Sequence, residues 1–179
     1  MSAAVCLINP KFAHNVGNVL RACSCFDASH LYWTGDRVPL KVDKGQRLPR
    51  EERMKGYRDV VMERTDRPFD GEAAFLTPIA VEVRHGSELI VDFEHPENAI
   101  YVFGPEDGSL PTWALLHCHR FVMIPSAHCL NLASAVNIVL YDRRVKRIQA
   151  GLEPRLPPAE YLKEHRGMVA DGNELFQLD

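Results

Sequence analysis

Apolar and polar residues alternate along the 179-residue chain in a pattern that predicts strands followed by helices. Short, almost continuous apolar runs at residues 4–9, 99–103 and 120–124 predict strands that are covered on both faces, as parallel strands are. Each of these runs ends at a proline or at a Gly-Pro pair. Weaker apolar runs predict further strands at 31–34, at 60–62 and within 75–83, where Pro78 falls near a strand end or edge.

Helical spacing of apolar residues separates these strands. The first such set is Val16, Val19, Leu20, Cys23 and Phe26. It predicts a helix from residue 14 or 15 to residue 26, with Asn15 as a plausible N-cap. Pro111 precedes a predicted helix at 112–117, and a long helix is expected at 130–148. Strands that alternate with helices predict an α/β domain with a mainly parallel sheet and helices on both faces.

Composition is that of an ordinary globular protein, with 46% hydrophobic and 25% charged residues, and the length fits one domain. No apolar run reaches the ~20 residues that span a bilayer, and the amino-terminal residues do not resemble a signal peptide. Five cysteines without a C-x-x-C pair favour reduced thiols in a cytoplasmic protein over a disulfide framework. We therefore expect a cytoplasmic protein that does not interact with membranes.

Cys118 lies between His117 and His119, which raises the question of a metal site. This spacing lacks the paired ligands of zinc patterns, so we expect no metal and interpret the segment as a helix end that leads into a strand.

The net charge of −3 is not that of a typical nucleic-acid-binding domain, but it conceals two basic clusters. The second cluster, Arg143, Arg144, Lys146 and Arg147, ends the long predicted helix. Charge alone leaves open whether these clusters bind RNA or are solvated surface, since cations also favour helix C-termini. The first cluster falls within residues 37–58 and comprises Arg37, Lys41, Lys44, Arg47, Arg50, Arg53, Lys55 and Arg58.

Three segments place small or polar residues at the carboxyl ends of predicted strands, where open α/β sheets bind ligands. They are residues 13–26, 103–111 and 124–142. Taken singly, each has a plain structural explanation: a capped helix, a turn built on Gly and Pro, and a cap at Asn131.

Together and in this order, the three segments resemble the SpoU/TrmH branch of the SPOUT superfamily of methyltransferases. Its first motif, N-x-G-x-x-x-R, matches Asn15, Gly17 and Arg21; its second, a strand followed by G-x-E, matches residues 101–106. Its third, Ile-Pro followed by S-L-N and a long helix, matches Ile124-Pro125 and Leu130-Asn131. The resemblance covers about residues 4–148 and is greatest to the small tRNA wobble-position ribose methyltransferases.

The resemblance implies a catalytic domain over residues 1–149 with a deep trefoil knot at about 75–149, followed by an extension at 150–179. It also implies a homodimer that binds S-adenosylmethionine, releases S-adenosylhomocysteine and methylates a ribose 2′-hydroxyl of RNA, with tRNA the expected substrate. The loops that hold the cofactor in the family correspond here to Leu76, Thr77 and Pro78; to Phe103, Gly104 and Pro105; and to residues 124–130, with Ile124, Cys129 and Leu130.

The catalytic residues implied by the resemblance are Arg21, Asn15, Glu106 and Asn131. In the family, the arginine that matches Arg21 is assigned the activation of the ribose hydroxyl. Because arginine stays protonated in proteins, Arg21 can instead orient an RNA phosphate and stabilise an alkoxide. Asn15 would position Arg21 or the ribose, Glu106 would hold the site through hydrogen bonds, and Asn131 would anchor the third loop.

The chain departs from the family pattern at two positions. Cys129 replaces the serine before L-N, and Ser109 replaces the second glycine of the second motif. Two alternatives to a ribose methyltransferase acting on tRNA follow: a catalytically inactive protein that binds RNA or cofactor, and an enzyme of the same fold that methylates rRNA or a base.

Overall fold

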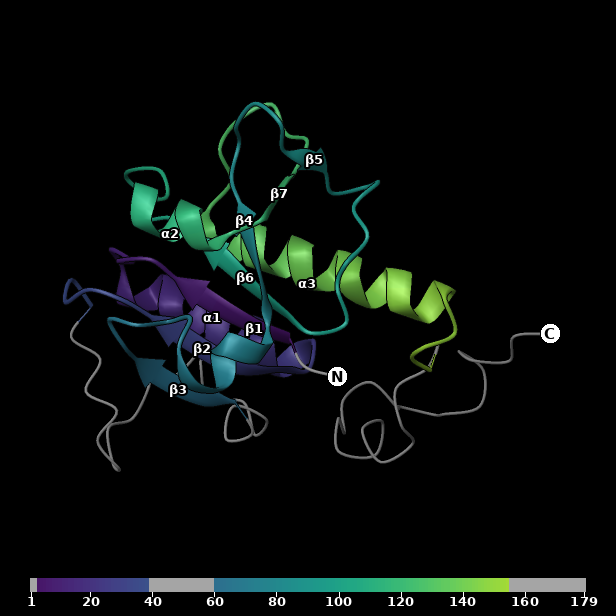
Figure 1. Cartoon of the computed structure of the whole chain (residues 1–179), viewed down its shortest axis with the longest axis horizontal. Helices are drawn as coiled ribbons and strands as arrows, with labels where there is room; N and C mark the ends of the chain where they lie inside the picture. Colours follow the sequence, from purple (N-terminus) through teal and green to yellow (C-terminus); the bar gives the residue numbers. More distant parts are fainter. Residues whose placement is uncertain (1–2, 39–59, 155–179) are drawn as a thin grey trace, which may run out of the picture. The chain divides into compact units, whose positions relative to one another are not determined.

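A seven-stranded sheet organises the computed structural model, which describes residues 3–38 and 60–154 (Figure 1). Within these residues the strand order is β3-β2-β1-β6-β4-β7-β5, and all the paired strands are parallel. The strands are β1 (Ala3–Leu7), β2 (Ala28–Trp33), β3 (Val61–Arg64), β4 (Thr77–Val81), β5 (Glu88–Leu89), β6 (Ala99–Phe103) and β7 (Arg120–Met123). The predicted α/β class with a parallel sheet is confirmed.

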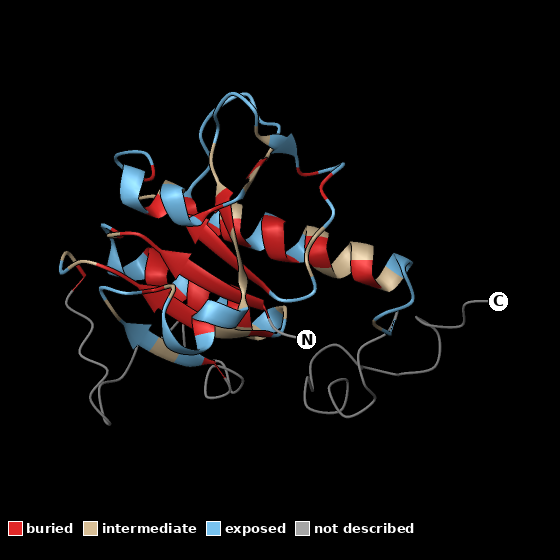
Figure 2. Ribbon diagram, in the orientation of Figure 1, coloured by how far each residue is buried: buried red, intermediate tan, exposed pale blue. Residues whose placement is uncertain are grey.

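Helices cover both faces of this sheet, as Figure 2 shows by the buried layer between them. Helix α1 (Ala13–Cys25) and the first part of α3 (Leu132–Gln149) pack on one face, against Val5, Leu7 and Tyr101. Helix α2 (Thr112–His117) and the 3-10 helix η3 (Gly71–Phe75) pack on the other face. Successive strand residues point to opposite faces, which explains why β1 and β6 are apolar throughout.

Most predicted elements are confirmed within a few residues at each end. The segments 99–103 and 112–117 match β6 and α2 in full, and the strand expected at 60–62 is β3. Strand β5 and helix η3 were not predicted. Strand β5 is only two residues long and is exposed, so it has no apolar pattern. The basic segment 37–58 lies almost entirely outside the described residues.

The prediction that Asn15 caps the first helix is wrong. The helix begins at Ala13, with Phe12 in the N-cap position and no side-chain cap hydrogen bond. Asn15 therefore lies inside the first turn and is 2% exposed, so its amide is directed to other partners. Asn131 does cap α3: its Oδ1 accepts hydrogen bonds from the backbone N–H groups of Ala133 and Ser134, at 2.9 and 3.3 Å.

Contacts divide the chain into two compact units, Met1–Arg143 and Arg144–Asp179. The division falls within α3, whereas the resemblance predicts a boundary at 149/150, and that boundary stays a prediction. In the described part of the second unit, Glu153 accepts a hydrogen bond from Arg147 Nε at 2.6 Å and pairs with Arg144 at 3.5 Å.

All five cysteines are free. Burial raises the pKa of the Cys23 and Cys118 thiols to about 12. Among residues 3–38 and 60–154, no three metal-binding side chains gather, and α2 leads into β7 at Cys118 as predicted. None of the helices described is long and apolar enough to cross a bilayer.

A close contact joins the loops that follow β1 and β2. Asn9 and Gly35 both have positive φ, at 48° and 77°, and the N–H of Asn9 donates to Thr34 Oγ1 at 3.0 Å. A Cβ on Gly35 would lie 2.3 Å from Asn9 Oδ1, so the positive φ of Gly35 and the position of the Asn9 side chain both favour glycine here.

We expect Gly35→Ala to lower the free energy of unfolding by at least about 2 kcal/mol, because it adds a clash to the strain of a left-handed residue. The control is Gly86→Ala, which has a φ of +87° but no atom within 4 Å of the added Cβ and should lose only about 1 kcal/mol. Urea unfolding measures both variants, and equal losses would contradict the loop contact.

Candidate functional site

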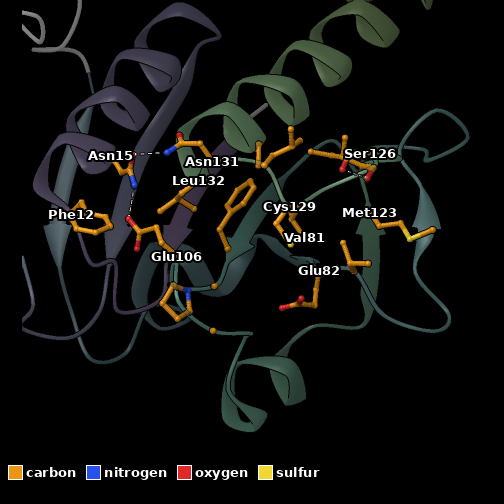
Figure 3. Close-up of a pocket in the computed structure, with 18 of the residues that line it drawn as sticks. Phe12, Asn15, Val81, Glu82, Glu106, Met123, Ser126, Cys129, Asn131 and Leu132 are labelled. Carbon is orange, nitrogen blue, oxygen red and sulfur yellow. Dashed lines mark hydrogen bonds between the residues drawn. The ribbon is translucent and has the colours of Figure 1, made fainter.

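A cavity of about 480 Å³ opens at the carboxyl edge of the sheet, where the ends of β1, β6, β4 and β7 meet (Figure 3). Its volume lies in the range of small-molecule sites. Phe103, Ile124 and Leu132 supply apolar walls, while Asn15, Glu106 and Asn131 supply polar groups. The three motif segments of the sequence therefore contribute to one cavity.

Hydrogen bonds join the three polar motif residues into a chain. Asn15 Nδ2 donates to Glu106 Oε1 at 2.6 Å, and Asn131 Nδ2 donates to Asn15 Oδ1 at 3.1 Å (Figure 3). These two hydrogen bonds fix the orientation of the Asn15 amide, because an amide turned by 180° would point its carbonyl oxygen at the Glu106 carboxylate. A second hydrogen atom on Nδ2 of each asparagine stays available to a ligand.

Glu106 has both carboxylate oxygens engaged. Oε1 binds Asn15, and Oε2 accepts the backbone N–H of Lys11 at 2.7 Å, so the loop after β6 is tied to the loop after β1. Partial burial acts to raise the pKa of Glu106, but the hydrogen bonds from Asn15 and from backbone N–H groups outweigh it and hold the pKa below its ordinary value. Glu106 is thus a fixed acceptor and is poorly suited to hold a proton at neutral pH.

We use the word rim for the Phe12–His14 pair, which lines the cavity, and for the cationic side chains bound to Asp107, which follows the lining residue Glu106. The Arg37 guanidinium binds both oxygens of Asp107, at 3.0 and 2.8 Å, and Lys11 Nζ lies 3.2 Å from Asp107. These contacts hold the pKa of Asp107 well below its usual range. Phe12 and His14 line the cavity and stack with ring centroids 5.3 Å apart, and Phe12 is 43% exposed.

The structure brings most of the predicted cofactor residues to the cavity. Its lining includes Phe103, Gly104, Pro105, Ile124, Cys129 and Leu130. Gly104 is close to its own loop, since a Cβ there would lie 3.1 Å from the backbone nitrogen of Leu110. The close packing of the 104–110 loop against Gly104 therefore favours glycine at this position, in addition to any approach of a ligand.

Leu76 and Thr77 are not among the residues that line the cavity, so their role in holding the cofactor stays a prediction. Thr77 begins β4, at the amino end of the strand, and its N–H donates to the carbonyl of Asn98. Because all strands are parallel, this end lies at the edge opposite the cavity. Pro78 falls inside the strand, at a position where β4 pairs with β6 but not yet with β7.

Three residues at the end of β4 line the cavity but were not predicted from the sequence. They are Val81, Glu82 and Val83, directly after or at the end of the strand. The apolar run Ile79-Ala80-Val81 indicates that the strand continues to Val81, and hence that the residues at and after Val81 lie at its carboxyl end.

Arg21 is the predicted catalytic residue that does not line the cavity. It lies further along α1 than Asn15, on an exposed part of the helix. Helical geometry explains the separation, because residues six apart lie on different sides of a helix. Asn15, Glu106 and Asn131 are brought together within the chain, and Arg21 is not brought to them.

The loops that contain Cys129 and Ser109, the two departures from the family pattern, are each held by internal hydrogen bonds. Cys129 is exposed at the cavity, and the hydroxyl of Ser126 binds the carbonyls of His128 at 2.9 Å and Ile124 at 3.5 Å within the same loop. The loop of Ser109 is closed by a hydrogen bond from Gly108 N–H to the Pro105 carbonyl, at 3.3 Å.

We expect Glu106→Gln to lower the free energy of unfolding by about 1–2 kcal/mol, because one of the two donors at this side chain would then face an amide NH₂. The folded-state pKa of Glu106 is depressed, so its contribution is present above its ordinary pKa of 4.5 and is lost as the pH falls through the folded value. Urea unfolding at pH 7 and in steps below pH 4.5 measures the difference. Glu94→Gln, at an exposed position, is the control; a pH-independent difference would contradict the assignment.

Comparisons with known proteins agree with this geometry. The model of the SpoU rRNA Methylase family matches residues 2–141. A comparison with curated protein sequences gave no match.

Solved structures with similar folds include several RNA-modifying enzymes. A TrmH/SpoU tRNA modifying enzyme from A. aeolicus superposes with a TM-score of 0.70 at 19% identity, covering 91% of this chain and 85% of that one. The SpoU methyltransferase AviRb from Streptomyces viridochromogenes, in complex with AdoMet, gives 0.62 at 21% identity, over 82% of this chain and 60% of that one. A third structure, whose description concerns the 2-OH methylation of C/U34 on tRNA, superposes with a TM-score of 0.62 at 22% identity. The match covers 84% of this chain and 97% of that one.

At these identities the superpositions establish the fold, while the family match spans more than three quarters of the residues. The chain therefore belongs to the SpoU rRNA Methylase family, a family of RNA methyltransferases.

Proposed function

We propose that this chain is an S-adenosylmethionine-dependent methyltransferase that acts, as a homodimer, on a ribose 2′-hydroxyl of tRNA. The observation that carries the proposal is the meeting of Asn15, Glu106 and Asn131, one from each motif, at a single cavity. The AdoMet complex of AviRb and the tRNA 2-OH methylation structure support the cofactor and the reaction by similarity of fold.

The cavity suits the proposed methyl donor. Its volume and apolar walls fit an adenine ring and a short aliphatic chain, and its polar groups are few and fixed. When bound, S-adenosylmethionine supplies an electrophilic methyl group on a sulfonium. Residues of the chain then have the tasks of binding, orientation and charge stabilisation. The trefoil knot at 75–149 remains part of the proposal.

The rim suits RNA. Lys11 and Arg37 are cations held in place by Asp107, and the exposed Phe12–His14 pair offers a flat aromatic surface. Unpaired RNA bases stack on such aromatic side chains, and guanidinium groups bind phosphates. A nucleotide at the rim would present its ribose to the polar end of the cavity, beside Asn15.

Arg21 completes the proposal through the homodimer. Since Arg21 is outside the cavity of its own chain, we propose that the second subunit brings its Arg21 to the ribose. There it orients the RNA phosphate and stabilises the oxygen that attacks the methyl group, which becomes an alkoxide as its proton leaves. Asn15 holds the ribose or the arginine through its remaining amide hydrogen.

Mass spectrometry of nucleosides tests the reaction. Total tRNA and rRNA are incubated with the protein and labelled S-adenosylmethionine and are then digested. We expect label in 2′-O-methylated nucleosides from tRNA. Label on a base, or in rRNA alone, would contradict the proposed atom or substrate, and the absence of transfer would favour a catalytically inactive binding protein.

Arg21→Ala tests the role of the arginine. We expect methyl transfer to fall by at least about 100-fold, as is typical when a group that assists proton removal is lost. Cofactor affinity, measured by calorimetry, should stay nearly the same because Arg21 is outside the cavity. Arg67→Ala, at an exposed arginine on the segment between β3 and η3, is the control. Undiminished transfer by Arg21→Ala would remove the assigned role.

A further inference from the structure

Glu82 is a second carboxylate in the cavity, and the motifs of the family resemblance do not include it. It directly follows β4, and its backbone N–H donates to the carbonyl of Val122 on β7 at 3.0 Å. The backbone is therefore held at the end of the sheet, and the side chain lines the cavity (Figure 3).

The two oxygens of Glu82 are in different situations. Oε2 accepts the backbone N–H of Leu110 at 3.0 Å, which fixes the carboxylate against the loop that follows β6. Within residues 3–38 and 60–154, no hydrogen bond to Oε1 is found. Glu106 differs in this respect, because both of its oxygens are engaged by the protein. Glu82 thus keeps one acceptor for a ligand in a fixed position.

The surroundings of Glu82 limit what that ligand can be. Val81 and Val83 flank it in the sequence, and the cavity lining also includes Phe103 and Ile124; none of these four side chains offers a hydrogen-bond donor. A carboxylate placed among apolar groups is stabilised only if it receives hydrogen bonds. A ligand that combines an apolar body with hydroxyl or amine donors therefore fits this part of the cavity.

We propose that Glu82 accepts hydrogen bonds from the ribose hydroxyls of the adenosyl group of the methyl donor. This inference rests on the proposed function. An adenosyl group has an apolar ring next to two adjacent hydroxyls, which matches a carboxylate bordered by apolar walls. Acidic side chains bind nucleotide ribose in the same way in dinucleotide-binding folds. Glu82 then binds the donor, while Asn15 and Glu106 organise the opposite, polar end of the cavity.

Calorimetry with S-adenosylhomocysteine and its 2′-deoxy and 3′-deoxy analogues tests this role. Glu82→Gln is the variant, because the amide oxygen can keep the bond to Leu110 while the NH₂ group faces the ligand as a donor. For the wild type we expect at least one deoxy analogue to bind about tenfold more weakly than S-adenosylhomocysteine. For Glu82→Gln we expect S-adenosylhomocysteine to bind more weakly and the deoxy penalty to shrink, because a neutral amide NH₂ that donates to the hydroxyl oxygen replaces a stronger bond to a charged carboxylate.

Coupling between the variant and the missing hydroxyl is the result that identifies the contact, since a general loss of fold weakens all ligands equally. Glu94→Gln is the matched control and should bind every ligand as the wild type does. Equal deoxy penalties in wild type and Glu82→Gln would overturn the inference and leave the proposed function standing. A loss that affects S-adenosylmethionine far more than S-adenosylhomocysteine would also overturn it, because the carboxylate would then recognise the cation. A wild type that binds none of these ligands would overturn the inference and the proposed cofactor together.

Discussion

The hydrogen-bonded chain from Asn131 through Asn15 to Glu106 is the constraint on which the candidate site depends. It joins the start of α3, the first turn of α1 and the loop after β6, which are distant in sequence and follow different strands. The backbone of Lys11 adds the loop after β1 to the same carboxylate. The parallel strands place these segments at the same edge of the sheet, and the hydrogen bonds fix their positions relative to one another.

The position of Asn15 inside α1, rather than at its cap, makes this bridge possible. The oxygen of a capping side chain accepts hydrogen bonds from backbone N–H groups of its own helix. Asn131 does so, using its oxygen for α3 and its NH₂ for Asn15. With its carbonyl bound to Asn131 and one N–H bound to Glu106, the buried Asn15 is held in one orientation, as a group that positions a substrate must be.

The fold was largely predictable from sequence, because buried parallel strands such as β1 and β6 are apolar throughout and end abruptly at Pro10 and Gly104. The meeting of Asn15, Glu106 and Asn131 also followed from the order of the motifs. The contribution of β4 did not, because the family resemblance places the first cofactor loop at residues 76–78, whereas β4 continues to Val81. Pro78 is tolerated at a point where β7 does not yet pair with β4, so its missing N–H leaves no gap in the β4–β7 ladder.

A single chain also cannot reveal what a second chain supplies. The spacing of Asn15 and Arg21 within one motif suggests a shared task, yet six helical residues turn the two side chains to different sides of α1. Asn15 is buried against the cavity, while Arg21 is on an exposed part of the helix. In the proposed homodimer the two residues can still serve one reaction, because the helix of one subunit would complete the cavity of the other. The geometry of α1 is therefore the strongest physical argument for the proposed homodimer.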